Sequence, residues 1–210
     1  MHPIERESYR ILDRRVDLSD LPPLTRSVVA RVIHASADLD FARSMVVSEA
    51  DLEAALVALE RGAPVIADVE MVRAGIADVG VRCYLDRAPA GALPTRSAAA
   101  IRAACEEHPD GGVFVVGCAP SALSELVALA ADGTVRPALV IGTPVGFVGA
   151  AESKEALRAS GLPSVSNVGE KGGSAVAAAA MNALLRHVAT ARTNAGAEEQ
   201  VGLEEGEQDG

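Results

Sequence analysis

The sequence predicts an α/β protein, a three-layer sandwich in which helices cover both faces of a mostly parallel sheet. From residue 64 onward, short and continuously apolar runs alternate with segments of helical spacing. Strands that are buried on both faces have this uninterrupted apolar character, because helices cover each face of a parallel sheet. The chain has 210 residues, 49% of them hydrophobic, which suits one domain of this kind.

The first 45 residues are predicted to be helical. Apolar side chains keep a 3.6-residue spacing over residues 4–12 and again over 28–33, and Pro22–Pro23 separates the two segments. A third helix is predicted to begin after Ser48, which suits the N-cap position, and to end at Gly62. These N-terminal helices precede the sheet.

The remaining elements alternate along the chain. Strands are predicted at residues 64–67, 81–85, 113–116, 138–141 and 164–168. Helices are predicted at residues 69–76, 97–107, 121–131, 151–159 and 174–188. Right-handed crossovers bring the strand-to-helix turns to one edge of the sheet, where α/β proteins bind their ligands.

The C-terminal segment differs in composition from the rest of the chain. Residues 190–210 hold six acidic side chains and one basic one, Arg192, and almost no large apolar residue. Such a segment buries too little surface to offset the entropy of ordering it. We therefore expect one α/β domain over residues 1–189 and a disordered acidic tail over 190–210.

Charge and aromatic content argue against a nucleic-acid partner. The chain has 19 Lys and Arg against 29 Asp and Glu, a net charge of −10, whereas a nucleic-acid backbone requires a basic face. Stacking platforms are also not expected, because the aromatic side chains are few and scattered, at Tyr9, Phe41, Tyr84, Phe114 and Phe147. The longest uncharged run, residues 137–151, is too short and too rich in Gly and Pro to cross a membrane.

The cysteines favour the reducing cytoplasm. Cys83, Cys105 and Cys118 are odd in number and form no C-x-x-C pair, which argues against a disulfide framework. No second Cys or His stands at metal-ligand spacing from any histidine, so we expect no metal site. The N-terminus has neither a basic region nor an apolar one, and we expect no signal peptide.

Two glycine-rich turns fall on the predicted ligand edge, at residues 142–146 and 169–174. Glycine lets a ligand approach the backbone closely, and the helix that follows offers free N–H groups to an anion. Neither turn is a P-loop, and no dinucleotide fingerprint occurs in the chain. The glycines could equally serve only to make tight turns.

Two side chains stand out as candidates for chemistry. His34 ends an apolar helix and is followed by small polar residues that suit the lining of a pocket. Histidine is the usual general acid or base, although a histidine at a helix end is more often a structural hydrogen-bonding group. Arg96 stands at a predicted helix start, where the helix dipole disfavours a cation unless an anion is near. It therefore suits a carboxylate ligand, or else lies on the solvated surface.

Several segments in order along the chain match a known family. They are residues 31–38 (RVIHASAD), 62–72 (GAPVIADVEMV), 95–100 (TRSAAA), 144–154 (PVGFVGAAESK) and 171–174 (KGGS), the last followed by an Ala-rich helix. Through them the chain resembles the precorrin-8X methylmutases of cobalamin biosynthesis over roughly residues 3–186.

The resemblance implies an isomerase that moves a methyl group between neighbouring carbons of ring C of a corrinoid. The product would be hydrogenobyrinic acid, or cobyrinic acid where the ring carries cobalt. No redox cofactor or metal is consumed. The family histidine falls on His34, the implied proton donor, and the family is homodimeric. The expected substrate contacts, from the resemblance together with the turns described above, are Ser8, Thr95, Arg96, Ser121, Gly142, Lys171, Gly172, Gly173 and Ser174.

Two positions depart from the family pattern. Cys118 stands where the family commonly has Asn, and Glu170 stands where it usually has Arg. The first loses an amide and the second reverses a charge, although Lys171 could compensate for it. Two other functions remain open on the sequence, namely a non-catalytic tetrapyrrole carrier and an α/β protein that binds a phosphorylated metabolite at residues 172–174.

Overall fold

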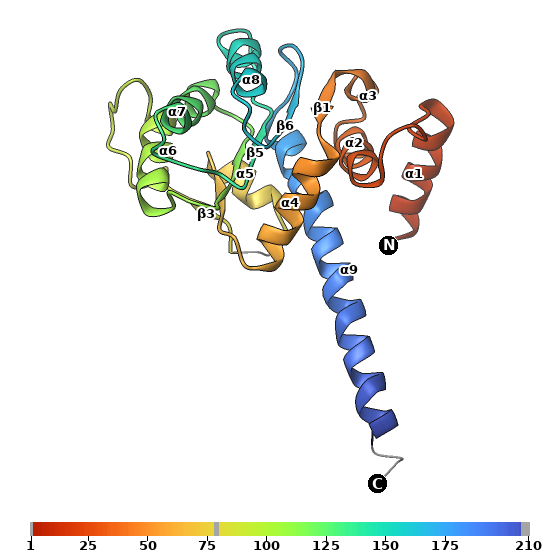
Figure 1. Cartoon of the computed structure of the whole chain (residues 1–210). Coiled ribbons are helices and arrows are strands. Elements are labelled where there is room, and N and C mark those ends of the chain that lie inside the picture. The colour runs from red at the N-terminus through yellow and green to blue at the C-terminus, as the bar shows by residue number, and fades with distance from the viewer. Residues whose placement is uncertain (1, 78–79, 207–210) are drawn as a thin grey trace.

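The structure is a computed structural model that describes residues 2–77 and 80–206, with side chains as far as residue 193. Figure 1 shows the arrangement of the elements. The helices are α1 (Pro3–Arg15), α2 (Pro23–Ser36), α3 (Phe41–Ser44), α4 (Glu49–Glu60), α5 (Glu70–Gly75), α6 (Arg96–Glu107), α7 (Pro120–Ala131), α8 (Ala150–Ala159) and α9 (Ser174–Gly206). The strands are β1 (Met45–Val47), β2 (Val65–Ala67), β3 (Arg82–Cys83), β4 (Val113–Val116), β5 (Leu139–Gly142) and β6 (Ser164–Asn167).

The described residues form one six-stranded sheet of order β1-β6-β5-β4-β2-β3. Every neighbouring pair is parallel except β1 and β6, which run antiparallel with Val46 opposite Ser166. The predicted α/β class with a mostly parallel sheet is therefore confirmed. Because β2, β3, β4, β5 and β6 point the same way, their carboxyl ends and the loops that follow them lie along one edge.

Helices cover both faces of the sheet and create two apolar cores (Figure 1). On strand β4, Val113 and Val115 pack toward α2, α4, α5 and α9, whereas Phe114 and Val116 pack toward α6, α7 and α8. This alternation follows from the two-residue period of a strand. Helix α1 lies outside this sandwich and packs on α2, with Leu12 as its buried residue.

The sequence prediction missed the strand at residues 45–47. It extended the helical region to residue 45, but Met45–Val47 form the edge strand β1 after the short helix α3. Three residues are too few to show a strand periodicity, and their pairing with β6 is a contact more than 100 residues away in sequence. The predicted strand at 81–85 is also shorter in the structure, where β3 covers Arg82–Cys83 alone.

The helix start predicted after Ser48 is confirmed, and the structure shows a second side-chain cap at Thr95. Ser48 caps α4, because its hydroxyl accepts a hydrogen bond from the Asp51 N–H at 3.3 Å. Thr95 caps α6 in the same way, accepting from the Ala98 N–H at 3.2 Å. These caps set where α4 and α6 begin.

Helix α9 extends away from the body of the molecule (Figure 1). Val188 is the last buried side chain among those described, and the helix continues to Gly206 without a break. At the boundary predicted at residue 189, the burial of side chains changes but the secondary structure does not. The disorder expected for residues 190–210 stays a prediction. In the part of the chain that the structure describes, no helix is both long and apolar enough to span a membrane.

A candidate active site between helices α2, α5 and α9

His34 lies on the last turns of α2 and is held by two residues of α1. Its Nδ1 lies 2.7 Å from the hydroxyl oxygen of Ser8, and the two atoms share a hydrogen bond. The ring of Tyr9 stacks on the imidazole at 5.0 Å between centroids, with 12° between the planes. Helix α1 thereby fixes both the position and the plane of the imidazole, which leaves Nε2 as the ring atom available to a ligand.

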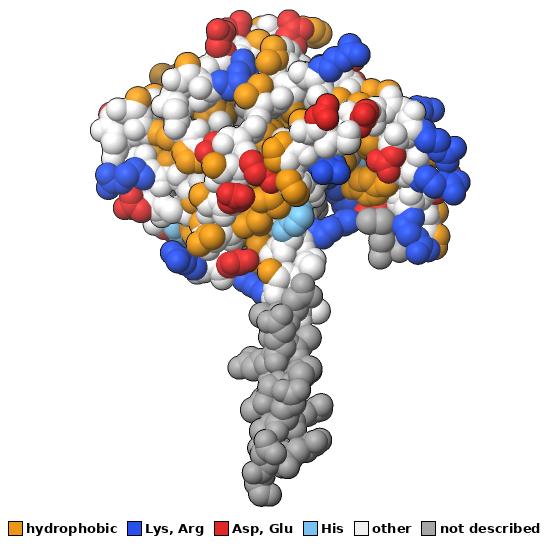
Figure 2. All heavy atoms as spheres, turned by 45° about the vertical axis from the view of Figure 1, so that its right-hand side comes forward, with side chains coloured by type: hydrophobic (Ala, Val, Ile, Leu, Met, Phe, Trp, Pro, Cys, Tyr) orange, Lys and Arg blue, Asp and Glu red, His pale blue; other side chains and the backbone are white. Residues whose placement is uncertain are grey.

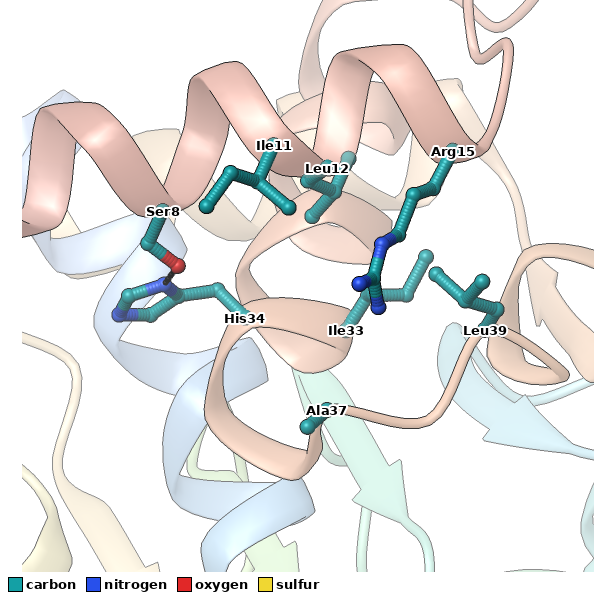
Figure 3. A pocket seen from close by; sticks show the side chains of 8 residues that line it. All are labelled: Ser8, Ile11, Leu12, Arg15, Ile33, His34, Ala37 and Leu39. Carbon is teal, nitrogen blue, oxygen red and sulfur yellow. Dashed lines mark hydrogen bonds between the residues drawn. The ribbon is translucent and has the colours of Figure 1, made fainter.

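One side of His34 faces a small pocket between α1 and α2 (Figure 3). Its volume is about 110 Å³, and Ile11, Leu12, Arg15 and Leu39 are among the side chains that line it. Ligand pockets are typically about 300–1,000 Å³. In Figure 3 the ring nitrogen that does not bond Ser8 points away from these side chains. This pocket is therefore neither large enough for a macrocycle nor aligned with Nε2.

The other side of His34 borders a longer groove. One hollow of about 280 Å³ is lined by Arg31, His34, Ala35, Gly75, Ala175, Ala178, Ala179 and Asn182. A second hollow of about 340 Å³ continues from it along α9, because Arg31 and Asn182 line both. Figure 2 shows Lys and Arg side chains gathered in a hollowed surface beside the base of α9. We call these two hollows together the α9 groove.

The walls of the α9 groove nearest His34 are formed by small side chains. Gly75 of α5 packs so closely on α9 that a Cβ added to it would lie 2.9 Å from the Ala178 Cβ. The Asn182 side chain ties the two helices together, since its amide donates to the Gly75 carbonyl and its Oδ1 accepts from the Ala77 N–H, both at 2.8 Å. Small walls leave the groove open to a bulky ligand.

A cluster of charged side chains lies at the boundary between the two hollows. Glu5 of α1 accepts hydrogen bonds from Arg31 of α2 at 2.6 Å and from Arg186 of α9 at 2.7 Å, both on its Oε1. The Arg186 guanidinium, together with Arg31, holds the pKa of the Glu5 carboxyl below its usual range. Glu5 is therefore ionised at neutral pH and links three helices beside the groove.

The two glycine-rich turns pack against each other at the carboxyl edge of the sheet. The Gly173 N–H donates to the Thr143 carbonyl at 2.8 Å, and the Gly146 N–H donates to the Glu170 carbonyl at 3.1 Å. At Gly172, φ is +153° and an added Cβ would lie 2.2 Å from the Thr143 oxygen. These contacts favour the tight-turn interpretation of the glycines, because two of the N–H groups already have acceptors.

Lys171 and Lys154 each connect the turn at residues 169–174 to a neighbouring segment. The Lys171 ammonium lies 2.7 Å from Asp38 and 2.6 Å from Asp40, in the segment that follows α2, and so ties the turn to the end of the helix that carries His34. The Lys154 side chain is completely buried and donates to the Lys171 carbonyl at 2.6 Å and to Asn167 Oδ1 at 3.3 Å. Burial lowers the pKa of Lys154 to about 8.

A buried carboxylate shapes the loop between β4 and α7. Asp68, 1% exposed, accepts hydrogen bonds from the N–H groups of Gly117, Cys118 and Ala119 at 2.8–3.2 Å. Burial raises the pKa of Asp68, and the three N–H donors oppose that rise. Cys118, at the position of the family Asn, is exposed in this loop as a free thiol.

The structure brings Thr95 and Ser121 together, with their hydroxyl oxygens 2.7 Å apart. Arg96 is exposed beside them, and its Nε donates to the Ala88 carbonyl at 3.3 Å. Gly142 lies elsewhere, fully buried in β5, where an added Cβ would lie 2.5 Å from Leu157. Ser174 begins α9 close to Gly117. The expected contacts therefore divide into those at His34, those at the glycine turns and those at the start of α6, with Gly142 inside the core.

Groups of His, Cys, Asp or Glu side chains arranged to hold a metal ion do not occur among the residues that the structure describes. The three cysteines are all free. Cys105 is buried, and Cys83 is partly buried.

Comparison with known proteins decides the family. The sequence model of the family CbiC, described as precorrin-8X methylmutase, matches residues 3–187. The chain belongs to the precorrin-8X methylmutase family. It is therefore an isomerase of the methylmutase type, as the resemblance in the sequence implied.

Its methylmutase relatives are similar along nearly their whole length. The cobalt-precorrin-8 methylmutase of Methanothermobacter thermautotrophicus is 39% identical, over 88% of this chain and 92% of the relative. The precorrin-8X methylmutase of Pseudomonas aeruginosa is 40% identical, over 86% of this chain and 93% of the relative. The crystal structure of a precorrin-8X methylmutase from Thermus thermophilus superposes with a TM-score of 0.82 at 37% identity, covering 90% of this chain and 99% of that one.

Sequence reasoning singled out His34 and Ser8, which the structure brings together, but it passed over Arg31, Asn182 and Arg186, which line the α9 groove. One signal was available, because Arg31 precedes His34 by three residues and so lies on the same face of a helix. Asn182 and Arg186 gave no such signal. Their contacts are with Gly75 and Glu5, more than 100 residues away in the chain, and only the fold brings them together.

Proposed function

We propose that the enzyme moves the ring-C methyl group of precorrin-8X to give hydrogenobyrinic acid, with His34 as the proton donor. The observation that carries the proposal is the orientation of His34. Its Nδ1 shares a hydrogen bond with the Ser8 hydroxyl at 2.7 Å, and its Nε2 points away from the small pocket. His34 also lines the α9 groove. Relatives named for the cobalt-containing substrate make conversion of cobalt-precorrin-8 to cobyrinic acid the second form of the same reaction.

The hydrogen bond to Ser8 determines which ring nitrogen can act. When the Ser8 hydroxyl donates to Nδ1, the proton of the neutral imidazole resides on Nε2. Nε2 then donates a hydrogen bond or a proton to the macrocycle at ring C, which makes the carbon that receives the methyl group more electrophilic. General acid catalysis of this kind contributes about 10²–10⁴-fold to the rate.

The remaining expected contacts serve binding in this proposal. Arg96, Thr95 and Ser121 would contact one carboxylate of the substrate at the start of α6. The turn at residues 171–174 would contact another part of the macrocycle. Arg96 supports this role because no carboxylate bonds its guanidinium in the part of the chain that is described. Lys171 is already bonded to Asp38 and Asp40, so its contribution would require exchange of those partners.

We further propose that the enzyme acts as a homodimer in the cytoplasm and consumes no cofactor. Three free cysteines suit a reducing compartment. Two very exposed apolar side chains, Phe147 at 90% and Val148 at 88%, suit contact with a second copy. Sedimentation of the purified protein measures the oligomeric state directly, and a monomer at micromolar concentration would refute the dimer.

The test of function is conversion of the substrate by purified protein. Precorrin-8X is mixed with the wild type or with His34→Ala, and the visible spectrum is followed for the orange product. We expect colour with the wild type and none, or a rate lower by about 10²–10⁴-fold, with His34→Ala. Retained binding of hydrogenobyrinic acid by the variant would assign the loss to chemistry. Cobalt-precorrin-8 is tested in parallel.

The two alternative functions give different results. A tetrapyrrole carrier would bind hydrogenobyrinic acid but convert neither substrate. A protein for phosphorylated metabolites would bind phosphate at residues 172–174 and have no affinity for the corrinoid. Either result would refute the proposed proton transfer by His34.

A further inference from the structure

We infer that Arg31 and Arg186 form a binding site for a carboxylate of the substrate, in the α9 groove beside His34. The inference rests on the proposed function, because the corrinoid acids supply the ligand class. Neither arginine belongs to the contacts that the sequence singled out.

The position of the two arginines is the first support. Arg31 lies three residues before His34 on α2 and lines both hollows of the groove, and Arg186 lines the second. Their side chains are 24% and 46% exposed, so each reaches the groove while part of it is buried. A macrocycle placed over Nε2 of His34 would extend its side chains toward this pair.

The balance of charge is the second support. Glu5 Oε1 accepts from both guanidinium groups, so a single negative charge faces two positive ones. Arg192 lines the same hollow and adds a third positive charge. Each guanidinium has five N–H donors in a planar fork that matches a carboxylate, and the bond to Glu5 uses one of them. The cluster therefore has both the charge and the donors for a second carboxylate.

The contrast with Lys171 is the third support. Two carboxylates, Asp38 and Asp40, surround that single ammonium, so the local balance there is negative. An anionic ligand would be repelled at Lys171 unless the aspartates moved, whereas at Arg31 and Arg186 it would meet a surplus of positive charge. Of these two cationic clusters, the arginine pair is the better carboxylate site.

The competing explanation is that the cluster of Glu5, Arg31 and Arg186 has a purely structural role. Substitution of Glu5 distinguishes this role from ligand binding. Glu5→Gln and Arg186→Gln each remove one charge from the same contact between α1 and α9. If the contact only holds α1 in place, both variants weaken ligand binding alike. If the arginines bind the ligand, Arg186→Gln weakens binding, whereas Glu5→Gln removes a competing anion and leaves binding equal or tighter.

The experiment is a spectroscopic titration of the wild type and both variants with hydrogenobyrinic acid, repeated with the same corrinoid after its carboxylates are converted to amides. We expect Arg186→Gln to raise the Kd for the acid about tenfold or more and to leave the Kd for the amide unchanged. Arg186→Lys, which keeps the charge, is expected to recover part of the affinity. Glu5→Gln is expected to match or exceed the affinity of the wild type.

The inference is overturned if Glu5→Gln and Arg186→Gln weaken binding equally, or if Arg186→Gln binds the acid as the wild type does. The Glu5→Gln result decides by itself if Arg186→Gln does not fold. Failure of the proposed function has a different signature, because the wild type would then neither bind hydrogenobyrinic acid nor convert precorrin-8X.

Discussion

The buried ammonium of Lys154 donates a hydrogen bond to the carbonyl oxygen of Lys171 at 2.6 Å. Among the described residues, Lys154 forms no ion pair with a carboxylate, and its other hydrogen-bond partner is the Asn167 amide oxygen. A single buried amine therefore holds the backbone at the point where the turn before α9 begins, and its protonation state bears on the stability of the fold.

The pH dependence of stability follows from Lys154. Burial, followed by the nearby Arg158 charge, lowers its pKa to about 8 from an ordinary value of 10.5. Between these values the unfolded chain binds more protons than the folded one, so this residue makes the free energy of unfolding rise with pH. Urea unfolding of the wild type and of Lys154→Met from pH 7 to pH 10 should show the wild type gaining stability relative to the variant above pH 8. A constant difference across the range would contradict the assignment.

Removal of the Ser8 hydroxyl should slow the reaction with little effect on folding. Ser8→Ala leaves Nδ1 of His34 without its partner, so the imidazole loses its fixed tautomer and orientation. We expect kcat to fall about tenfold or more. Ser27→Ala is the matched control, because it removes a similar Ser–His hydrogen bond, 3.0 Å long, to His187. Equal kinetic effects of the two substitutions would argue against a role for Ser8 in catalysis.

Asp68 is expected to stabilise the loop between β4 and α7. Asp68→Asn places an amide group among three N–H donors and removes the negative charge that they share. The free energy of unfolding should fall by about 2–4 kcal/mol, as measured by chemical denaturation. Asp132→Asn, at an exposed aspartate that accepts from the Thr134 N–H, is the control and should change little. A stable Asp68→Asn protein would show that the loop does not depend on this carboxylate.

Gly172 should tolerate no side chain, because an added Cβ would collide with the Thr143 carbonyl. Comparison with Gly161 separates this collision from the effect of a positive φ. Gly161 has a φ of +75° with open space around it, so Gly161→Ala tests backbone conformation alone and should cost about 1–2 kcal/mol. Gly172→Ala adds a collision with the Thr143 carbonyl and should be much more destabilising. Thermal unfolding of both variants makes the comparison. Similar losses would show that the turn can move away from Thr143.

The sequence predicted the central strands β2, β4 and β5 well because they are short, apolar and bounded by Gly or Pro. Residues 113–116 match β4 in full, and residues 164–168 match β6 to within one residue. Helix starts were predictable where a capping hydroxyl stands before the helix, as at Ser48 and Thr95. Strand β1 could not be predicted, because its three residues form a strand only by pairing with β6.

The site was predictable only in part. His34 was visible because it ends an apolar helix. The packing of the two glycine turns against each other was not predictable, because the Thr143 carbonyl that accepts from the Gly173 N–H belongs to a different loop. The linkage of Glu5 to Arg186 spans almost the entire chain, and no local pattern in a sequence encodes such a contact.

Helix α9 has a consequence for the size of the ligand. Ser174 stands at its first residue, beside the edge of the sheet, and Arg186 stands in the groove on the same helix. At 1.5 Å per residue, the rise along the axis between them is about 18 Å. A small phosphorylated metabolite could reach one end or the other, whereas a macrocycle with its side chains extended could span both. The length of one rigid helix, more than the shape of any single pocket, would then favour a macrocycle over small metabolites, which could contact only one end.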